Sequence, residues 1–233
     1  MQELLSSPTF WTAVGSIGTA AGFFAVSAQL LSMRKQSKIL EDTYAFDSSW
    51  RSKNKAIEIC ESFNNEIMPL IDYVLAVVPR EETIKDFSTL SLVGEIEFSK
   101  LDFEQLYGPL DEYVNRRAES IARIDAEEYR KARELLEQSG HGKLLAPDFP
   151  YGAERVGEYA RVTYSIIRFF EQMGIYFLTG TADSDVGKEV VGPVFTAVVE
   201  VLYGDMCNYA AITKSTVNFK FISELRNEWA AVS

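Results

Sequence analysis

The 233-residue chain contains only one histidine, His141, and two cysteines, Cys60 and Cys207. A single imidazole excludes metal sites built on several histidines, including di-iron bundles with two Glu-x-x-His pairs. It also requires that any Ser-His-Asp or Cys-His device use His141. This residue lies in Gly140-His141-Gly142-Lys143, which lacks the preceding strand and longer glycine-rich signature of a phosphate-binding loop. We therefore expect no catalytic residue, no metal and no cofactor, and the protein is predicted not to be an enzyme.

Charge is absent from the whole stretch between Leu4 and Met33. A helix from Phe10 to Met33 would be about 36 Å long, which is enough to cross a hydrocarbon core of about 30 Å with some tilt. Pro8 is a natural helix start, and Phe10 and Trp11 are suited to the headgroup region. The stretch therefore predicts one N-terminal transmembrane helix, and the lipid bilayer is the first expected partner.

The basic cluster Arg34, Lys35 and Lys38 follows this stretch, whereas the N-terminal flank has only Glu3. Cationic flanks stay in the cytoplasm, which predicts a single-pass protein with its N-terminus outside, an anchor over residues 1–38 and a cytoplasmic domain over residues 39–233. A cleaved secretory signal is one alternative, but its n-region would lack Lys and Arg, and the basic cluster would oppose export. A surface-lying helix is another alternative, but no charged face exists for it.

Small residues recur in the anchor at Gly15, Gly18, Gly22 and Ala25, spaced three, four and three apart, with Gln29 next in the same stripe. Such a stripe lets a second helix approach closely in a membrane, and Gly18 and Gly22 form a Gly-x-x-x-Gly unit. Self-association through this stripe is one interpretation. The other is that small residues are common in membrane spans and recur by chance.

The chain has 34 acidic and 23 basic residues, for a net charge of −11. This balance argues against nucleic-acid binding, which depends on Lys and Arg contacts with phosphate. Cys60 and Cys207 each lie in an apolar helical pattern and would face a reducing cytosol, so both are predicted to be buried free thiols. A disulfide would require the opposite topology.

No strand pattern competes with helical periodicity, so the predicted fold is all-α, with the transmembrane helix followed by a bundle of antiparallel helices. The first helix continues from the membrane to Pro69, which ends or kinks it. Its buried face begins at Trp50 and repeats at positions 57, 60, 64, 67, 71 and 74. Residues 79–100 are expected to form a loop with at most one short element. Helices are predicted over residues 110–139, 153–178, about 184–212 and 216–231, with Gly140 and Gly180 as terminators and Asp183 or Ser184 as an N-cap.

Glu171 has mainly apolar neighbours on its predicted helix, so it is expected to point toward the core. A buried carboxylate must be paired, hydrogen-bonded or protonated. Its role is either structural or part of a ligand-binding pocket with Tyr164 and Arg168. Glu200 repeats the pattern on the next helix, where small neighbours predict tight helix packing.

The late helix contains Arg168-Phe169-Phe170-Glu171-Gln172-Met173-Gly174, and the closing segment runs from Asn218-Phe219-Lys220-Phe221 to Trp229. Together with the N-terminal span, these segments resemble a bacterial family of membrane-anchored proteins known only as a domain of unknown function. The resemblance covers most of the chain and implies a helical domain anchored to the bacterial inner (cell) membrane. That family has no assigned reaction, so the resemblance implies no catalytic residue.

The sequence thus predicts a non-enzymatic membrane protein whose acidic cytosolic domain binds a protein partner or forms a homo-oligomer. Two alternatives remain open. One is a membrane-perturbing effector of a toxin or phage-defence system, and the other is a ligand sensor or enzyme with a pocket around Glu171.

Overall fold

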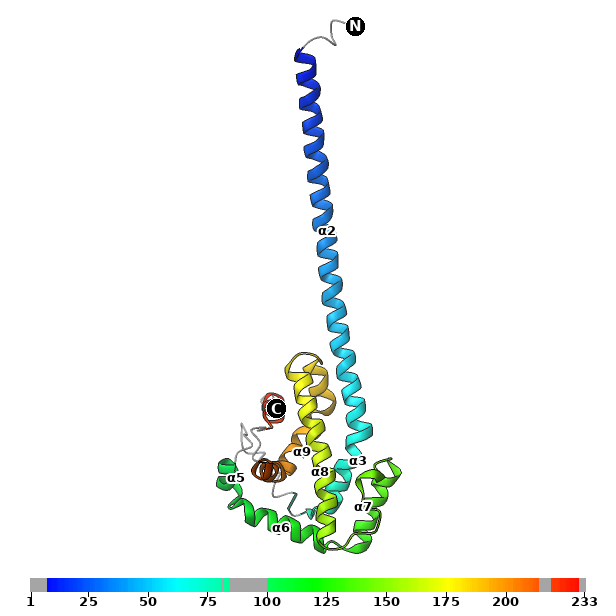
Figure 1. Ribbon diagram of the computed structural model, residues 1–233, viewed down its shortest axis with the longest axis vertical. Helices are drawn as coiled ribbons and strands as arrows, with labels where there is room; N and C mark the ends of the chain where they lie inside the picture. The colour runs from blue at the N-terminus through cyan, green and yellow to red at the C-terminus, as the bar shows by residue number, and fades with distance from the viewer. Residues whose placement is uncertain (1–7, 81, 84–99, 214–218, 231–233) are drawn as a thin grey trace. The chain divides into compact units, whose positions relative to one another are not determined.

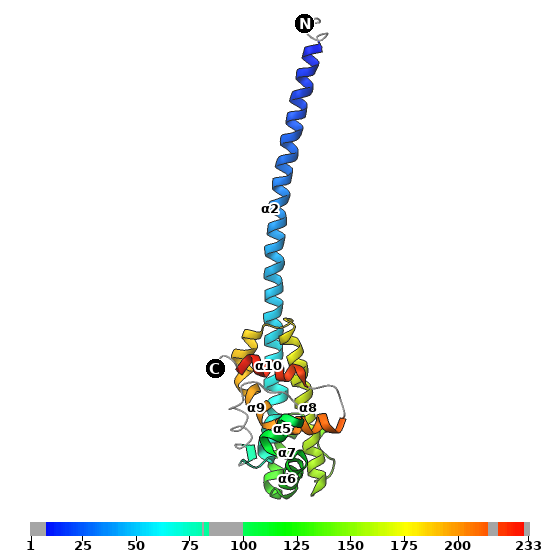
Figure 2. The same cartoon turned by 90° about the vertical axis from the view of Figure 1, so that its left-hand side faces the viewer.

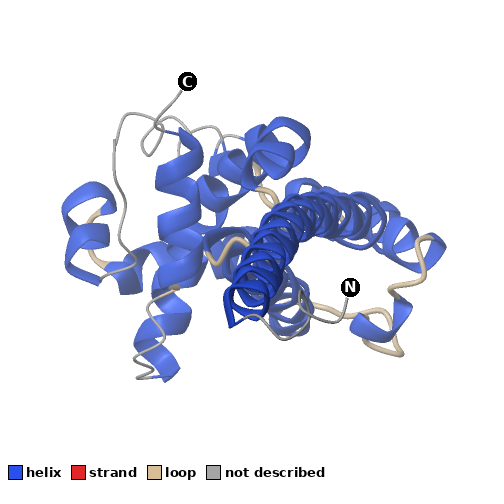
Figure 3. Ribbon diagram, turned by 90° about the horizontal axis from the view of Figure 1, so that it is seen from above, coloured by secondary structure: helices blue, strands red, loops and turns tan. Residues whose placement is uncertain are grey.

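The computed structural model describes the backbone of residues 8–80, 82–83, 100–213 and 219–230, and the side chains of residues 32–80, 82–83, 103–212 and 219–230. The regular elements in these ranges are all helical, with no strand among them (Figure 3). The predicted all-α class is confirmed. The chain divides into two compact units, Met1–Trp50 and Arg51–Ser233. The predicted division at residues 38 and 39 was drawn from the membrane signal and stays a prediction.

The long helix α2 (Pro8–Ser62) gives way to the π-helix η1 (Phe63–Ile67), which is followed by α3 (Met68–Val77). Pro69 lies in the first turn of α3. Proline has no N–H to donate and its ring excludes the carbonyl four residues earlier, so the regular α-helical bonding pattern cannot continue through this position. The irregular turn before Pro69 confirms the predicted interruption.

Part of the predicted buried face is correct, since Cys60, Ile67 and Val74 are buried. Trp50 and Ile57 were predicted to be buried, but their exposed fractions are 58% and 48%. The structure corrects these two positions and Asn64, which is also exposed, because the side of the helix that packs on the domain here carries Ala56, Ile59 and Phe63 instead.

The region predicted as one helix over residues 110–139 consists of two, α6 (Leu110–Arg123) and α7 (Ala126–Gln138). The side chain of Asp125 accepts the backbone N–H groups of Glu127 and Glu128 at 2.8 and 3.2 Å, which starts a new helix. At the other end of α7, Gly140 has φ +84° and its N–H donates to the carbonyl of Glu137. The predicted glycine terminator is therefore confirmed.

The next helices follow the predicted bounds closely. Helix α8 (Ala153–Leu178) agrees at both ends, and α9 (Ser184–Thr213) begins after Asp183, whose side chain accepts two backbone N–H groups of its first turn. The closing helix α10 (Lys220–Ala230) starts later than predicted, and residues 214–218 lie outside the described part. The short helix α5 (Lys100–Tyr107) was not predicted.

Helix α8 lies at the centre of the domain. It contacts α3 and α6, and α3 also packs against α7 (Figure 1). Helix α10 packs across α8 and α9, and α5 packs against α6 and α9 (Figure 2). A chain of aromatic rings joins these elements in the core: Phe63, Phe170, Phe195 and Trp229 follow one another with centroid separations between 4.9 and 6.1 Å.

Among the described residues, one helical segment is long and apolar enough to cross a membrane, Ser184–Ile212 in α9. Within this segment, 67% of the most apolar window is buried inside the domain. The apolar surface of the segment therefore forms part of the hydrophobic core. The structure does not support the predicted N-terminal span, whose side chains lie outside the described residues, and that span stays a prediction.

Candidate functional site

A cavity of about 180 Å³ lies between α6, α8 and α9. Val114 and Ile121 line it from α6, and Val156 and Ile167 line it from α8. A polar end is formed by Arg117, Tyr159, Thr163, Asp205 and Asn208. An apolar cavity with a few converging polar groups is the usual form of a small-molecule site, so this is the leading candidate.

Arg117 is the most highly connected charge at the cavity. Its guanidinium donates to the Tyr113 hydroxyl at 2.6 Å and to the Val201 carbonyl at 3.3 Å. It also lies 3.3 Å from a carboxylate oxygen of Glu82 and 3.9 Å from one of Asp205. Two carboxylates therefore face one guanidinium, and this cluster offers no net positive charge to an incoming ligand.

The carboxyl of Asp205 accepts a hydrogen bond from the Tyr159 hydroxyl at 2.8 Å. Burial raises the pKa of Asp205 above its usual value, while the nearby guanidinium of Arg117 and the phenol of Tyr159 act in the opposite direction. Burial also raises the pKa of the Tyr159 phenol well above its usual value.

The close contact between α6 and α9 beside this cluster depends on Gly204. A Cβ atom at Gly204 would lie 2.2 Å from Cζ of Tyr113, the residue that accepts the Arg117 hydrogen bond. The sequence prediction of tight packing near Glu200 is confirmed at this position.

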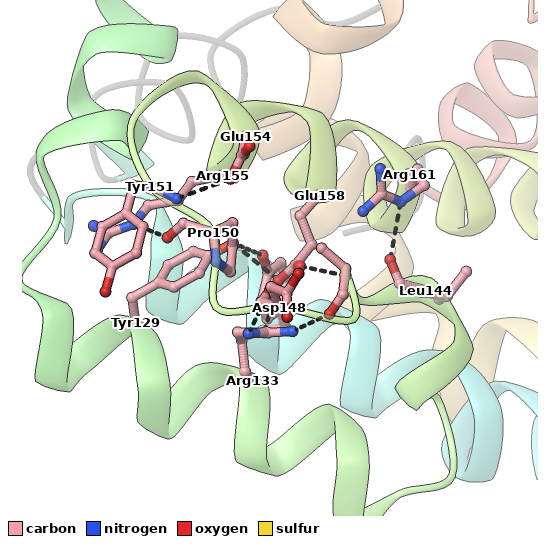
Figure 4. A network of polar contacts seen from close by, with 12 residues as sticks. Tyr129, Arg133, Leu144, Asp148, Pro150, Tyr151, Glu154, Arg155, Glu158 and Arg161 are labelled. Carbon is pink, nitrogen blue, oxygen red and sulfur yellow. Dashed lines mark hydrogen bonds and ion pairs between the residues drawn. The ribbon is translucent and has the colours of Figure 1, made fainter.

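A second buried charged network holds the connection between α7 and α8 (Figure 4). Glu158 is fully buried, accepts the Tyr129 hydroxyl at 2.9 Å and the Ala146 N–H at 2.8 Å, and pairs with Nε of Arg133 at 3.2 Å. Arg133 also donates to the Ala146 carbonyl at 2.6 Å. Both carboxylate oxygens are occupied, which gives Glu158 a structural role.

Arg155 completes this network from the first turn of α8. Its guanidinium donates to the carbonyls of Ile124 and Pro150 and lies 4.7 Å from the Tyr129 ring centroid (Figure 4). One side chain thereby connects the break between α6 and α7 to the start of α8. The Tyr129 hydroxyl also lies 3.1 Å from that of Tyr73, which links the network to α3.

Glu200, which the sequence placed in apolar surroundings, is 3% exposed and pairs with Arg226 of α10 at 2.7 Å. Two charges buried together in this way satisfy each other, and breaking such a pair is strongly destabilising. This contact fastens α9 to α10.

Glu171 accepts the backbone N–H groups of Phe221 and Ile222 in the first turn of α10. The residue before that turn, Phe219, has no side-chain oxygen to cap the helix, so a carboxylate from α8 performs that task. Its other oxygen, Oε2, is buried without a hydrogen-bond partner. Burial is the largest influence on this group and raises the pKa of Glu171, although the two N–H groups lower it.

The three residues of the predicted pocket, Tyr164, Arg168 and Glu171, do not form one site. Tyr164 lines the cavity and its ring packs against Tyr209 at a centroid distance of 5.2 Å. Glu171 is directed to α10, and Arg168 is exposed on α8. Neither of these two lines the cavity.

A second depression of about 300 Å³ lies between the end of α2 and α8. Lys55 and Glu58 form an ion pair at its edge, and Lys55 lies 5.2 Å from the ring centroid of Tyr176. The ion pair is largely exposed to solvent. The described side chains that line this depression include no buried polar group that indicates a ligand.

The first unit presents a different kind of surface. Large apolar side chains are exposed along α2 beyond the predicted anchor, with Ile39, Phe46 and Trp50 between 58% and 71% exposed. Thr43 lies between them, and its hydroxyl donates to the Ile39 carbonyl within the same helix. We call Ile39, Thr43, Phe46 and Trp50 the α2 seam. The small residues Gly15, Gly18, Gly22 and Ala25 belong to the same helix, but their surroundings lie outside the described side chains.

Cys60 and Cys207 are buried and not in a disulfide, as predicted, and burial raises the pKa of the Cys60 thiol. His141 lies in the loop after α7, at the start of the 3₁₀ turn η2 (Gly142–Leu144). Among the residues that the structure describes, no three His, Cys, Asp or Glu side chains form a cluster suited to a metal ion.

Sequence reasoning did not identify Arg117, Tyr159, Thr163 or Asp205. A signal for Arg117 was present, because it lies three residues after Val114 and four before Ile121 on the apolar face of α6. No local signal could have brought Tyr159 and Asp205 together, since they belong to different helices.

The chain matches no protein-family model, and no curated protein or solved structure is detectably similar to it.

Proposed function

We propose that this protein is a non-enzymatic, single-span protein of the bacterial inner membrane, with its acidic helical domain in the cytoplasm, and that it forms a homo-oligomer through α2. Membership of the membrane-anchored family of unknown function is part of the same proposal. The observation that carries it is the α2 seam, where three large apolar side chains stay exposed on one side of a helix.

The spacing of the seam supports a helical partner. Ile39, Thr43, Phe46 and Trp50 follow one another at intervals of four, three and four residues, which is the apolar repeat of a coiled coil. Continued toward the N-terminus at the same alternating interval, the repeat passes through uncharged positions only: Gln36, Ser32, Gln29, Ala25, Gly22, Gly18 and Gly15. The small-residue stripe and the exposed seam thus follow one heptad repeat, which a left-handed supercoil of two helices would keep at a single interface.

A second copy of the chain fits this face. Copies inserted in one membrane with the same topology are parallel, so each position of the repeat would meet its own counterpart. Small residues allow close approach within the bilayer, where van der Waals packing drives association. Ile39, Phe46 and Trp50 would remove apolar surface from water beyond it, which is the larger driving force in the cytoplasm.

Phe46→Glu tests the proposal, with Tyr44→Glu as the matched control. Both change an exposed aromatic residue of α2, but Tyr44 lies outside the repeat on a different face. Because Phe46→Glu would place carboxylates opposite each other in the interface, we expect the dissociation constant of the full chain in detergent to rise at least about tenfold, measured by sedimentation velocity. Tyr44→Glu should leave it unchanged. A monomeric wild type, or equal effects of the two variants, would contradict the proposal.

The membrane-perturbing alternative predicts a different result. A scaffold should leave the membrane potential intact when the protein is overexpressed, as measured with a potential-sensitive dye. Collapse of the potential by the wild type but not by Phe46→Glu would assign the effector role and keep the seam as the means of assembly.

A further inference from the structure

The cavity between α6, α8 and α9 has the size of a small-ligand site. A dry apolar cavity of about 150 Å³ can bind benzene, and the volume here is about 180 Å³. Val114, Ile121 and Ile167 supply branched apolar walls. This space therefore suits a single aromatic ring or a compact fused pair of rings, and not a nucleotide or a lipid chain.

The cavity wall carries a hydroxyl oxygen that accepts no hydrogen bond in the described part of the chain. Thr163 is 4% exposed, and its buried hydroxyl is directed at the phenol oxygen of Tyr159, which leaves Oγ1 as an acceptor without a donor. Its polar neighbour Tyr159 already donates its own proton to Asp205. A buried oxygen that accepts no hydrogen bond has lost its hydration without compensation, so a ligand with one hydrogen-bond donor would recover part of that free energy.

The charges at the polar end determine which ligands are disfavoured. Arg117 is compensated by the carboxylates of Glu82 and Asp205, and it also donates to the Tyr113 hydroxyl and the Val201 carbonyl. An anionic ligand would find no uncompensated positive charge there. Its desolvation would not be offset, so the ligand must be uncharged.

Two tyrosine rings mark the more exposed side of the cavity. Tyr164 and Tyr209 lie with ring centroids 5.2 Å apart, and Tyr164 is 43% exposed. Aromatic faces pack favourably against a flat ring. Entry past these rings would place the ligand between the apolar walls with its polar group within reach of the Thr163 side.

We propose that this cavity binds a small, uncharged, planar aromatic molecule with one hydrogen-bonding group, of the phenol or indole class. The ring lies against Val114, Ile121 and Ile167, and its O–H or N–H group bonds with Oγ1 of Thr163. This site is independent of the α2 seam, because all of its residues belong to the unit Arg51–Ser233.

The test uses the full chain in detergent, titrated with indole, phenol and benzene and followed by calorimetry and by the shift of the thermal unfolding midpoint. For ligands of this size we expect dissociation constants from about ten micromolar to about one millimolar. Thr163→Val is nearly isosteric and removes the hydroxyl. It should weaken indole and phenol about fivefold to tenfold and leave benzene binding unchanged or stronger.

Ser165→Ala is the matched control, since Ser165 is a hydroxyl residue of α8 that donates to the Arg161 carbonyl and does not line the cavity. It should not change any of the three affinities. Ala118→Leu places extra volume in the cavity and should weaken all three ligands. No saturable binding by the folded wild type, or unchanged indole affinity in Thr163→Val, would overturn the proposal, and both results are independent of the oligomeric state.

Discussion

At the scale of single residues, buried carboxylates in this domain act mainly as connectors. Glu158 joins α7 to α8 and Glu200 joins α9 to α10, each through an arginine. Glu171 joins α8 to α10 through backbone N–H groups instead. The difference matters for the pKa of Glu171, because no cation among the described residues offsets the loss of hydration of this carboxylate.

Glu171→Gln should change how stability depends on pH. Burial raises the folded-state pKa above the ordinary value of 4.5, so the folded state holds this proton to higher pH than the unfolded chain does. The contribution of this group to stability is therefore fully present below about pH 4.5 and is lost as the pH rises through the folded-state pKa. The free energy of unfolding of the wild type relative to Glu171→Gln should fall over that window in denaturant titrations.

A second variant separates charge from capping. Glu171→Ala removes the acceptor for the Phe221 and Ile222 N–H groups, so it should be less stable than Glu171→Gln by about 1 kcal/mol. Glu189→Gln, which removes an exposed carboxylate from α9, controls for the loss of one charge. A difference between wild type and Glu171→Gln that does not vary with pH would contradict the assigned burial.

Two glycines of α8 provide a residue-level test of helix packing. A Cβ atom at Gly174 would lie 2.6 Å from the backbone carbonyl oxygen of Phe221, whereas at Gly157 the nearest atom is a guanidinium nitrogen 4.0 Å away. Gly174→Ala should reduce the free energy of unfolding by about 2 to 3 kcal/mol, because backbone cannot move aside as a flexible side chain can. Gly157→Ala should increase it by up to about 1 kcal/mol through helix propensity. Thermal and denaturant unfolding distinguish these results, and similar effects at both positions would refute the close approach of α8 and α10.

At the scale of elements, helix ends were easier to predict than helix continuity. Gly140 and Asp183 act within one turn of their own helices, so their roles could be predicted from adjacent residues. The division between α6 and α7 was missed because the apolar spacing continues through Asp125. Capping by its side chain competes with helix continuation, and contacts such as that of Arg155 with the Ile124 carbonyl stabilise the break.

The candidate site was less predictable than the helices that form it. Tyr164 was identified on the correct element and lines the cavity, while Glu171 and Arg168 of the same helix do not. Residues seven positions apart on one helix lie near the same face, but they are about 10 Å apart along its axis and can meet different neighbours. Here the neighbour of Tyr164 is α9 and that of Glu171 is α10.

At the scale of the whole molecule, the proposed oligomer links the membrane segment to the exposed seam on one helix. The double substitution Gly18→Ile and Gly22→Ile should weaken oligomers of the full chain in detergent, because branched side chains prevent close approach of parallel helices. Ala20→Ile lies on the opposite side of α2 and is the matched control. Sedimentation velocity measures all three proteins. If the double variant has the same distribution of sedimentation coefficients as the wild type, the oligomer forms through the α2 seam alone and not through the small residues of the membrane segment.

The amino-acid sequence by itself determined the all-α class, both ends of α8, the glycine that terminates α7 and the burial of the two thiols. These features depend on apolar periodicity and on capping groups within a few residues, which are local properties of the sequence. Only the tertiary structure decided that Arg117 meets Asp205, that Glu171 caps α10 and that three helices enclose a cavity beside Thr163. Those contacts join residues distant in the chain, and their partners are set by how helices pack and not by local spacing.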